Sequence, residues 1–179
     1  MVEIDNLKFK PFLSEEKILE KIQELSSDIF EKYHGKNPLF ICVLKGSFTF
    51  TNELLRNFDF EYEIAFVRVK SYDGTQSANE VKEFYGLDSK LNNRHVVILE
   101  DIVETGFTTN YLIGKIQHEQ PASIEIATML FKPNRLKFPD LPIRHVAFEI
   151  SDEFVVGFGL DYNEKGRSLR SIYQLVEQD

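Results

Sequence analysis

The sequence predicts an α/β protein: a parallel twisted sheet flanked by helices, with a small β-rich appendage. Two apolar runs, residues 39–44 and 95–99, have the length of strands and lack polar alternation, as strands buried on both faces do. Strand and helix patterns alternate with short connections from residue 14 to about residue 131, which indicates parallel strand pairing. A chain of 179 residues has the size of one domain. We therefore expect a single domain whose core covers about residues 14–131.

The first helix is predicted to begin after Ser14, which is a typical N-cap residue. Glu15 and Glu16 lie in its first turn, where the helix dipole favours acidic side chains. Apolar residues then recur at helical spacing, namely Ile18, Ile22, Leu25 and Ile29. Gly35 and Pro38 end the helix before the first apolar strand.

The remaining core elements follow in the same alternation. Residues 45–47 interrupt the first strand, and a second helix is predicted to end near residue 57. Tyr62, Ile64 and Phe66 alternate with other residues, which predicts a strand. Residues 70–84 are polar and lack a period, so we expect a long functional or mobile loop. After the strand at 95–99, the pattern predicts a helix at about 108–118 and a strand at 123–131.

The last third of the chain has a different pattern. It contains short strand-like segments at 144–150, 154–159 and 172–176, and no strong helix pattern. We expect the β-rich appendage to cover about residues 132–179, with residues 1–13 as a candidate part of it.

Composition excludes several classes of function. The formal net charge is −8 at pH 7, which argues against non-specific nucleic-acid binding. Cys42 is the single cysteine, so an internal disulfide is excluded and no cysteine metal cluster is expected. The apolar runs are too short to span a bilayer, and residues 1–5 lack the features of a signal peptide. We therefore expect a cytoplasmic protein without membrane or nucleic-acid partners.

The most informative segment is residues 95–110, HVVILEDIVETGFTTN. A buried strand ends in Glu100 and Asp101, and a turn with Thr105 and Gly106 leads into a helix. Ligands of open α/β sheets bind at the carboxyl ends of the strands. A glycine-containing loop at a helix N-terminus directs backbone N–H groups at one point, which suits a phosphate. Adjacent carboxylates can accept hydrogen bonds from sugar hydroxyls, directly or through Mg²⁺. The whole segment therefore favours a phosphorylated ribose over a solvated, ordinarily capped turn.

These residues resemble a known family. The segment LEDIVETGFTT resembles the phosphoribosyl-pyrophosphate-binding motif of type I phosphoribosyltransferases, and the chain from about residue 39 to residue 175 is similar to their hypoxanthine-guanine branch. The resemblance implies a parallel five-stranded core with a small hood over the base, and a homodimer or homotetramer. It also implies a Mg²⁺-dependent transfer of the phosphoribosyl group to a 6-oxopurine, hypoxanthine or guanine.

The resemblance assigns the groups that would bind the phosphorylated sugar and the pyrophosphate. Glu100 and Asp101 match residues that hold the ribose and the metal, and the 5-phosphate would lie against residues 104–108, which are Glu104, Thr105, Gly106, Phe107 and Thr108. Leu44-Lys45-Gly46-Ser47 resembles the pyrophosphate loop, in which the peptide bond before the lysine is often cis. Ser71 and Tyr72 resemble the loop that closes over the transition state. Arg167 would contact pyrophosphate.

The base-binding residues come from the last third of the chain. Lys132 follows a predicted strand, and its match in the family donates to the purine O6. In the segment SDEFVVGFGLDYNEKGR, residues 151–167, Phe154 would stack on the base and Val155 would offer backbone groups to it. Asp161 would hold Mg²⁺, and it is also assigned to the purine site. Considered without the resemblance, residues 154–156 are most simply a core strand.

Glu104 is a departure from the family pattern. The family usually has aspartate at the position of the general base, in the pattern ED-I-[IV]-D-[TS]-G. Glutamate has the same acid–base chemistry as aspartate on a side chain that is one methylene longer. We therefore assign Glu104 the role of taking the purine proton. Lys45 and Arg167 are the other predicted catalytic residues, because they would neutralise charge on the leaving pyrophosphate.

Three alternatives remain at this stage. One is an enzyme of the same fold that is specific for xanthine or a pyrimidine. The second is a non-catalytic regulator that senses phosphoribosyl pyrophosphate, although such proteins tend to bind nucleic acid and this chain is acidic. The third is a flavodoxin-like cofactor binder, which gives no reason for adjacent Glu100 and Asp101.

Overall fold

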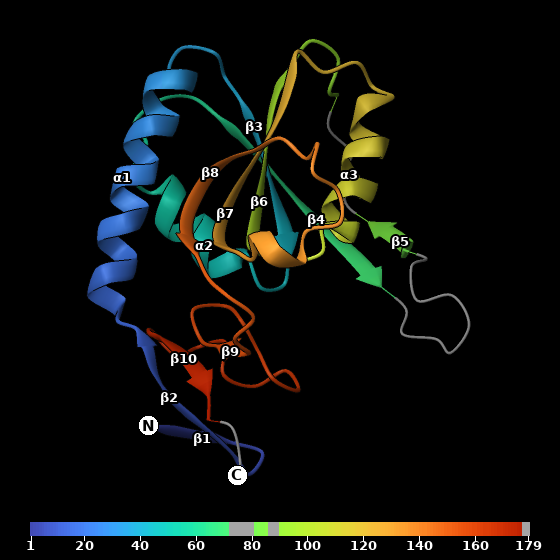
Figure 1. Ribbon diagram of the computed structural model, residues 1–179. Coiled ribbons are helices and arrows are strands. Elements are labelled where there is room, and N and C mark those ends of the chain that lie inside the picture. Colours follow the sequence, from blue (N-terminus) through green and yellow to red (C-terminus); the bar gives the residue numbers. More distant parts are fainter. Residues whose placement is uncertain (72–80, 86–89, 177–179) are drawn as a thin grey trace.

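A six-stranded sheet forms the centre of the computed structural model, which describes residues 1–71, 81–85 and 90–176 (Figure 1). The strands lie in the order β5-β4-β3-β6-β7-β8. Five of them are parallel, and β5 pairs with β4 in the antiparallel direction at one edge. Their bounds are β3 (Leu39–Leu44), β4 (Glu63–Ser71), β5 (Val81–Tyr85), β6 (His95–Val103), β7 (Ser123–Phe131) and β8 (Ile143–Glu149).

Helices cover both faces of this sheet. In Figure 1, α1 and α2 lie on one side of the strands and α3 lies on the other. The helices are α1 (Glu15–Tyr33), α2 (Phe48–Leu55) and α3 (Phe107–Gln117), and a short 3-10 helix, η1 (Pro133–Arg135), follows β7. Within the described ranges, no helix is long and apolar enough to cross a membrane. This layered arrangement leaves the ends of the parallel strands open for binding.

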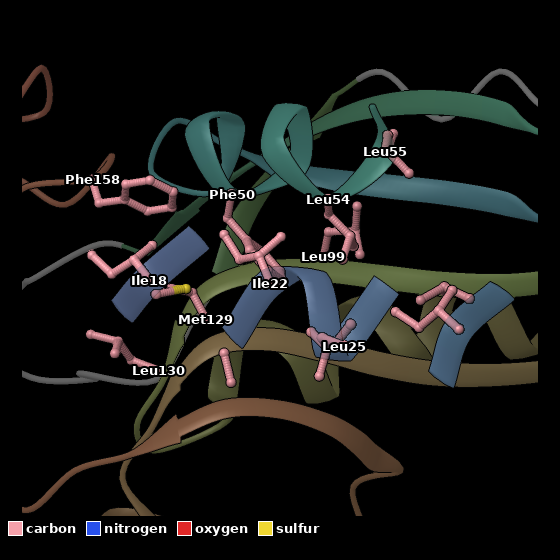
Figure 2. Close-up of a cluster of buried hydrophobic side chains, with 14 of the residues drawn as sticks. Ile18, Ile22, Leu25, Phe50, Leu54, Leu55, Leu99, Met129, Leu130 and Phe158 are labelled. Atoms are coloured by element: carbon pink, nitrogen blue, oxygen red, sulfur yellow. The ribbon is translucent and has the colours of Figure 1, made fainter. Parts of the chain in front are cut away.

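Each face of the sheet has its own hydrophobic core. Figure 2 shows the cluster under α1 and α2, in which Ile18 and Ile22 of α1 pack near Phe50 and Leu54 of α2. The cluster on the α3 side combines alternate residues of the central strands with α3, including Ile41, Ile98 and Leu112. The side chains of β3 and β6 therefore contact both cores, which explains their unbroken apolar sequences.

A second, antiparallel sheet forms the hood at the carboxyl ends of the parallel strands (Figure 1). Its strand order is β1-β2-β10-β9. It combines strands from the two ends of the chain: β1 (Val2–Ile4), β2 (Leu7–Leu13), β9 (Val155–Val156) and β10 (Ile172–Leu175). A small separate cluster around Ile4, Phe9 and Val156 packs inside it.

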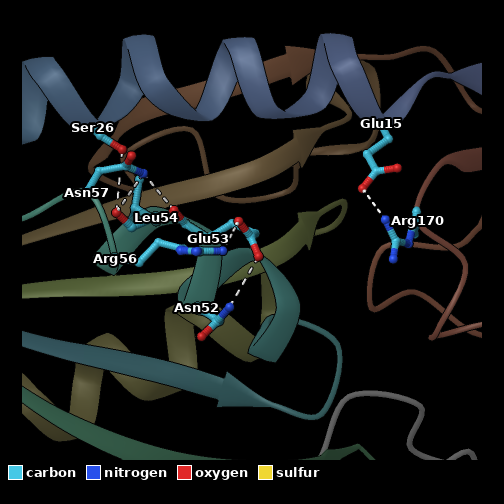
Figure 3. Close-up of polar contacts among 8 residues, drawn as sticks. All are labelled: Glu15, Ser26, Asn52, Glu53, Leu54, Arg56, Asn57 and Arg170. Carbon is cyan, nitrogen blue, oxygen red and sulfur yellow. Dashed lines mark hydrogen bonds and ion pairs between the residues drawn. The ribbon is translucent and has the colours of Figure 1, made fainter.

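Polar contacts attach the hood to the helical layer (Figure 3). The first residue of α1, Glu15, accepts from Arg170 at 3.3 Å, and its backbone N–H donates to the hydroxyl of Ser171 at 3.1 Å. Deeper in the layer, Ser26 of α1 donates to the carbonyl of Ile22 at 2.7 Å and lies 3.5 Å from the carbonyl of Leu54 in α2. These contacts connect the hood to α1 and α1 to α2.

The predicted α/β architecture is confirmed, with two differences. Ser14 caps α1 as expected, and its side chain accepts from the N–H of Lys17 at 3.4 Å. The expected boundary near residue 132 lies one strand too early, because β8 is the fifth parallel strand of the main sheet. Part of the expected loop at 70–84 is strand, since β4 ends at Ser71 and β5 occupies 81–85.

In β4, the larger apolar residues of the alternating pattern are on the exposed face of the strand, and the smaller ones are buried. Ala65 and Val67 are buried under the α3 face, whereas Ile64 and Phe66 are 40% and 42% exposed. Ile64 and Phe66 pair in register with Phe40 and Cys42 of β3, so they lie on the α2 side of the sheet. This part of the face is therefore an exposed apolar surface. Phe48, the first residue of α2, is also exposed, at 57%.

Candidate active site

A cavity of about 520 Å³ opens at the carboxyl edge of the main sheet. The ends of β3 and β6 supply most of its wall, together with the turn into α3. Two hood residues, Asp161 and Arg167, complete the lining. The remaining lining residues are Val43, Leu44, Lys45, Gly46, Val69 and residues 100–109. The sequence thus folds so that segments far apart in the chain meet around one polar cavity.

The two carboxylates at the end of β6 are poorly solvated. Glu100 is 5% exposed, and its Oε1 accepts from the hydroxyl of Thr109 at 3.2 Å. Burial raises the pKa of Glu100 well above its ordinary value, and the charge of Asp101 adds to this rise. Burial also raises the pKa of Asp101, to about 6, although Oδ1 accepts from the N–H of Ile102 at 3.0 Å. Both carboxylates are therefore suited to accept hydrogen bonds or a cation.

The turn after β6 presents backbone N–H groups to the same cavity. Gly106 is the N-cap of α3 and has a left-handed backbone, with φ of 80°. Thr105, Phe107 and Thr108 line the cavity with it. The ring of Phe107 packs edge-on against Phe138, with 5.0 Å between the centroids. The first N–H groups of a helix lack partners within the helix, so this turn is suited to bind an anion.

The loop after β3 approaches the hood through two glycines. The Leu44–Lys45 peptide bond is cis. A Cβ on Gly46 would lie 1.5 Å from Oδ2 of Asp101, and a Cβ on Gly159 would lie 2.0 Å from the carbonyl oxygen of Gly46. No side chain fits at either position. The absence of side chains lets the β3 loop, the β6 carboxylate and the hood backbone lie against one another.

Two cations that line the cavity, Lys45 and Arg167, share an acidic partner. Lys45 Nζ donates to Oε1 of Glu164 at 2.9 Å, and Arg167 Nη2 donates to Oε2 of the same carboxylate at 3.1 Å. Arg167 Nη2 also lies 2.7 Å from Oδ1 of Asp161, and Nη1 donates to the carbonyl of Gly159 at 2.8 Å. The buried Nε of Arg167 has no hydrogen-bond partner among the described residues. The two cations are thus close enough to share one anion.

Beside the cavity, Lys132 and Glu104 form a short ion pair. Lys132 follows β7, is 5% exposed, and donates to Oε1 of Glu104 at 2.5 Å. Asp152 Oδ1 lies 3.7 Å from the same ammonium group. A buried ammonium group needs a partner, and Glu104 supplies it. The pair thus joins two residues for which separate roles were predicted, the general base and the donor to the purine.

The predicted purine-binding residues Phe154 and Val155 lie at the start of β9 in the hood. Phe154 is 45% exposed, and its ring is 6.3 Å from that of Phe9 and 5.9 Å from that of Tyr162 between centroids. Val155 is buried in β9. Neither these two residues nor Lys132 lines the main cavity. Of the three, Lys132 contacts a residue of the cavity wall, Glu104.

The structure brings most of the predicted site residues together at the carboxyl edge. The side chain of Ser71 and the whole of Tyr72 lie outside the described residues, so their expected roles stay predictions. No role was predicted for Glu164, although it lies three residues after Asp161 and three before Arg167. The hydrogen bond from the hydroxyl of Thr109 to Glu100 and the place of Val69 in the cavity lining were not predicted either.

This arrangement suits a phosphorylated sugar that carries a polyphosphate as its leaving group. A turn that is suited to bind an anion follows two carboxylates in the same cavity wall, and two cations, Lys45 and Arg167, line that cavity as well. The chain belongs to the phosphoribosyltransferase family: the family described as phosphoribosyl transferase domain matches residues 10–163. This match covers the main sheet and all of the cavity lining except Arg167.

Its relatives define a narrower branch of that family. A hypoxanthine-guanine phosphoribosyltransferase from Streptococcus mutans is 42% identical over 169 residues, covering 94% of this chain and 93% of the relative. A protein of the same name from Streptococcus thermophilus is 39% identical over 94% of both chains. Among solved structures, a hypoxanthine phosphoribosyltransferase from Staphylococcus aureus is 38% identical with a TM-score of 0.85, covering 95% of this chain and 92% of the other.

Proposed function

We propose that this protein transfers the 5-phosphoribosyl group of phosphoribosyl pyrophosphate to N9 of hypoxanthine and guanine, a purine salvage reaction that releases pyrophosphate. The observation that carries the proposal is the single cavity in which the carboxylates of β6, the turn into α3 and two cations converge. The names of the relatives support this reaction, and they do not favour a non-catalytic regulator.

The turn of residues 105–108 would hold the 5-phosphate. Its N–H groups begin α3, and the positive end of the helix dipole favours a dianion there. Glu100 and Asp101 would accept hydrogen bonds from the ribose hydroxyls. Fixing the sugar from both sides would leave the anomeric carbon facing the base.

Lys45, Gly46 and Arg167 would bind the pyrophosphate, with Ser71 and Tyr72 added by the resemblance alone. Negative charge grows on this group as the glycosidic bond breaks, so cations that meet it there lower the barrier. The unpartnered Nε of Arg167 supports this assignment, because a buried donor without a partner is costly unless a ligand supplies one.

Mg²⁺ is part of the proposal. Among residues 1–71, 81–85 and 90–176, no three histidine, cysteine or acidic side chains are grouped to hold a metal by themselves. Mg²⁺ is commonly held by one or two carboxylates together with substrate phosphates. Asp101 and Asp161, which line one cavity, fit that mode, and buried Glu100 stays a candidate ligand. Bound there, the ion would neutralise charge on the pyrophosphate.

The base would enter between Glu104 and the hood. Glu104 would take the proton from N7 while N9 attacks the anomeric carbon. Lys132 would donate to O6, Phe154 would stack on the ring with its exposed face, and backbone groups near Val155 and Asp161 would meet the pyrimidine edge. The Glu104–Lys132 pair supports this placement, because the carboxylate occupies the acceptor position that O6 would take.

One assay tests the proposed function. Hypoxanthine, guanine, xanthine, adenine and uracil are each incubated with phosphoribosyl pyrophosphate, with Mg²⁺ or with EDTA. Hypoxanthine should be among the best substrates and guanine should be accepted. Adenine should fail, because its amino group would face the buried Lys132 ammonium, and mismatched polar groups discriminate by about 10⁴-fold or more. Comparable turnover of adenine, or full activity in EDTA, would contradict the base or metal assignment.

We also propose a homodimer or homotetramer in the cytoplasm. Ile64 and Phe66, which are exposed on one face of β4, support self-association, since exposed apolar patches commonly mark interfaces. Light scattering after gel filtration would decide: a strictly monomeric species at assay concentrations would contradict it.

A further inference from the structure

Glu164 lies where a pyrophosphate oxygen is expected. Its two carboxylate oxygens contact Lys45 Nζ at 2.9 Å and Arg167 Nη2 at 3.1 Å. These cations belong to different parts of the chain, the loop after β3 and the segment after β9, and both line the cavity. One carboxylate thus bridges the two cations as a bound polyphosphate would.

The backbone at Glu164 is unusual for a glutamate. Asn163 and Glu164 have φ values of 51° and 63°, and Tyr162 and Lys165 exchange two backbone hydrogen bonds of 3.0 Å. Two central residues with positive φ define a type I′ turn, in which the second position strongly prefers glycine. The chain has a strained glutamate there instead, and strain of this kind suggests a function for the side chain.

The backbone of the turn is anchored, while the Glu164 side chain is exposed to solvent. The N–H of Glu164 donates to Oδ2 of Asp161 at 2.9 Å, which anchors the backbone next to the cavity. The Glu164 side chain is 62% exposed, and the Lys45 side chain is 47% exposed. An exposed ion pair is weak enough for a stronger anion to displace it.

We propose that Glu164 is an internal counter-anion that neutralises Lys45 and Arg167 in the free protein and is displaced when a polyphosphate binds. The inference rests on the proposed function, in which these cations bind pyrophosphate. In the free protein, the carboxylates of Glu164 and Asp161 balance the charges of Lys45 and Arg167. Because a polyphosphate must displace Glu164 to bind, the affinity for phosphoribosyl pyrophosphate and for the product pyrophosphate is lower than it would be without this carboxylate. The lower affinity favours product release.

The test compares two substitutions of Glu164 with a matched control. Glu164→Gln removes the charge and keeps the shape, and Glu164→Gly restores the residue that the turn prefers. Asp5→Asn is the control, because Asp5 pairs with Lys165 of the same turn and does not contact Lys45 or Arg167. Calorimetry of the whole protein with magnesium pyrophosphate gives the dissociation constants.

Both Glu164 variants should bind pyrophosphate about two- to fivefold more tightly than wild type, the scale of an exposed ion pair, and the difference should shrink with added salt. The KM for phosphoribosyl pyrophosphate should fall in parallel, while kcat should not rise, because pyrophosphate leaves more slowly. Asp5→Asn should resemble wild type.

Unchanged or weaker pyrophosphate binding by Glu164→Gln, relative to Asp5→Asn, would overturn the inference even if wild type is fully active. A wild type that binds pyrophosphate but transfers nothing to any base would instead contradict the proposed function and leave the binding comparison intact. A wild type that binds no pyrophosphate would contradict both.

Discussion

At the amino-terminal edge of the main sheet, Glu125 is surrounded by donors, whereas the carboxylates at the opposite edge are not. Glu125 of β7 accepts from Lys32 at 2.5 Å and from the hydroxyl of Tyr33 at 2.9 Å, and it lies 3.1 Å from Nε2 of His145. Burial opposes its ionisation, but these hydrogen bonds outweigh burial and hold its pKa below the ordinary value.

At the carboxyl edge the balance is reversed. Among the described residues, Glu100 and Asp101 receive hydrogen bonds from one hydroxyl and from backbone N–H groups, and burial raises the pKa of both. The same side-chain type is thus stabilising at one edge and costly at the other. Burying Glu100 and Asp101 with so few donors costs free energy of folding, and strongly shifted pKa values tend to occur at functional sites. This difference therefore indicates that a ligand would complete the hydrogen bonding at the carboxyl edge.

The largest expected effect is on the rate, at the carboxyl edge. Glu104→Gln should lower kcat by about 10²–10⁴-fold, the usual contribution of general acid–base catalysis, while leaving substrate binding nearly intact. Glu104→Asp should be milder, because it restores the family residue, although it shortens the reach to Lys132. Single-turnover kinetics should be used, since slow product release can hide a chemical defect. A glutamine variant with more than about half of the wild-type chemical rate would refute the assignment.

The next effect is on stability, at the amino edge. Glu125→Gln should lower the free energy of unfolding by about 1–3 kcal/mol, because it removes the charge that Lys32 and Tyr33 contact. Its kcat should match that of wild type. Glu119→Gln, a change of the same charge at an exposed residue, serves as the control. Equal urea midpoints for the two variants would show that Glu125 does not stabilise the fold.

Asp101→Asn should show the opposite combination, a gain in stability with a loss of activity. The folded pKa of about 6 lies above the ordinary value of 3.8, so the contribution of this group to stability is complete below about pH 4 and is lost as the pH rises through 6. Near pH 7.5 the variant should be more stable than wild type by about 1–2 kcal/mol, and near pH 4 the two should converge. Thermal unfolding across this range measures the difference; a destabilised variant at pH 7.5 would contradict it.

The smallest expected effect concerns His145. Burial lowers its pKa below the ordinary value of 6.5. The carboxylates of Glu125 and Asp28 oppose this shift, and the positive charge of Lys32 adds to it. A lowered histidine pKa means that stability is complete above pH 6.5 and decreases as the pH falls below it. Melting temperatures between pH 8 and pH 5 should therefore fall more steeply for wild type than for His145→Gln. Parallel curves would assign the acid sensitivity to another group.

The sequence predicted the parts of the fold that local patterns control. The unbroken apolar residues of β3 and β6 identified central strands, and Ser14 identified the start of α1. It did not reveal that β8 joins the main sheet, because a strand pattern does not encode its partner. The exposure of Phe66 could not be foreseen either, since it depends on which element covers that face of β4, and the pattern within a strand does not encode this.

The same limit applies to the site. Residues 100–108 are contiguous, so their convergence follows from one strand, one turn and one helix. The pairs Glu104–Lys132 and Glu164–Lys45 join residues distant in sequence, and only the folded chain reveals them. Periodicity also gave no indication that Glu164 contacts two cavity residues, Lys45 and Arg167, because it lies in a turn.

The contact of Gly46 with Gly159 has a consequence for engineering base preference. Because the carbonyl of one residue occupies the place of a Cβ on the other, the two positions depend on each other although 113 positions separate them (159 minus 46). A hood exchanged with that of a relative will seat on this core only if it brings a residue without a side chain to the same point. Libraries that vary the hood should therefore keep both glycines. A folded variant with a side chain at either position should have a displaced loop at residues 45–47.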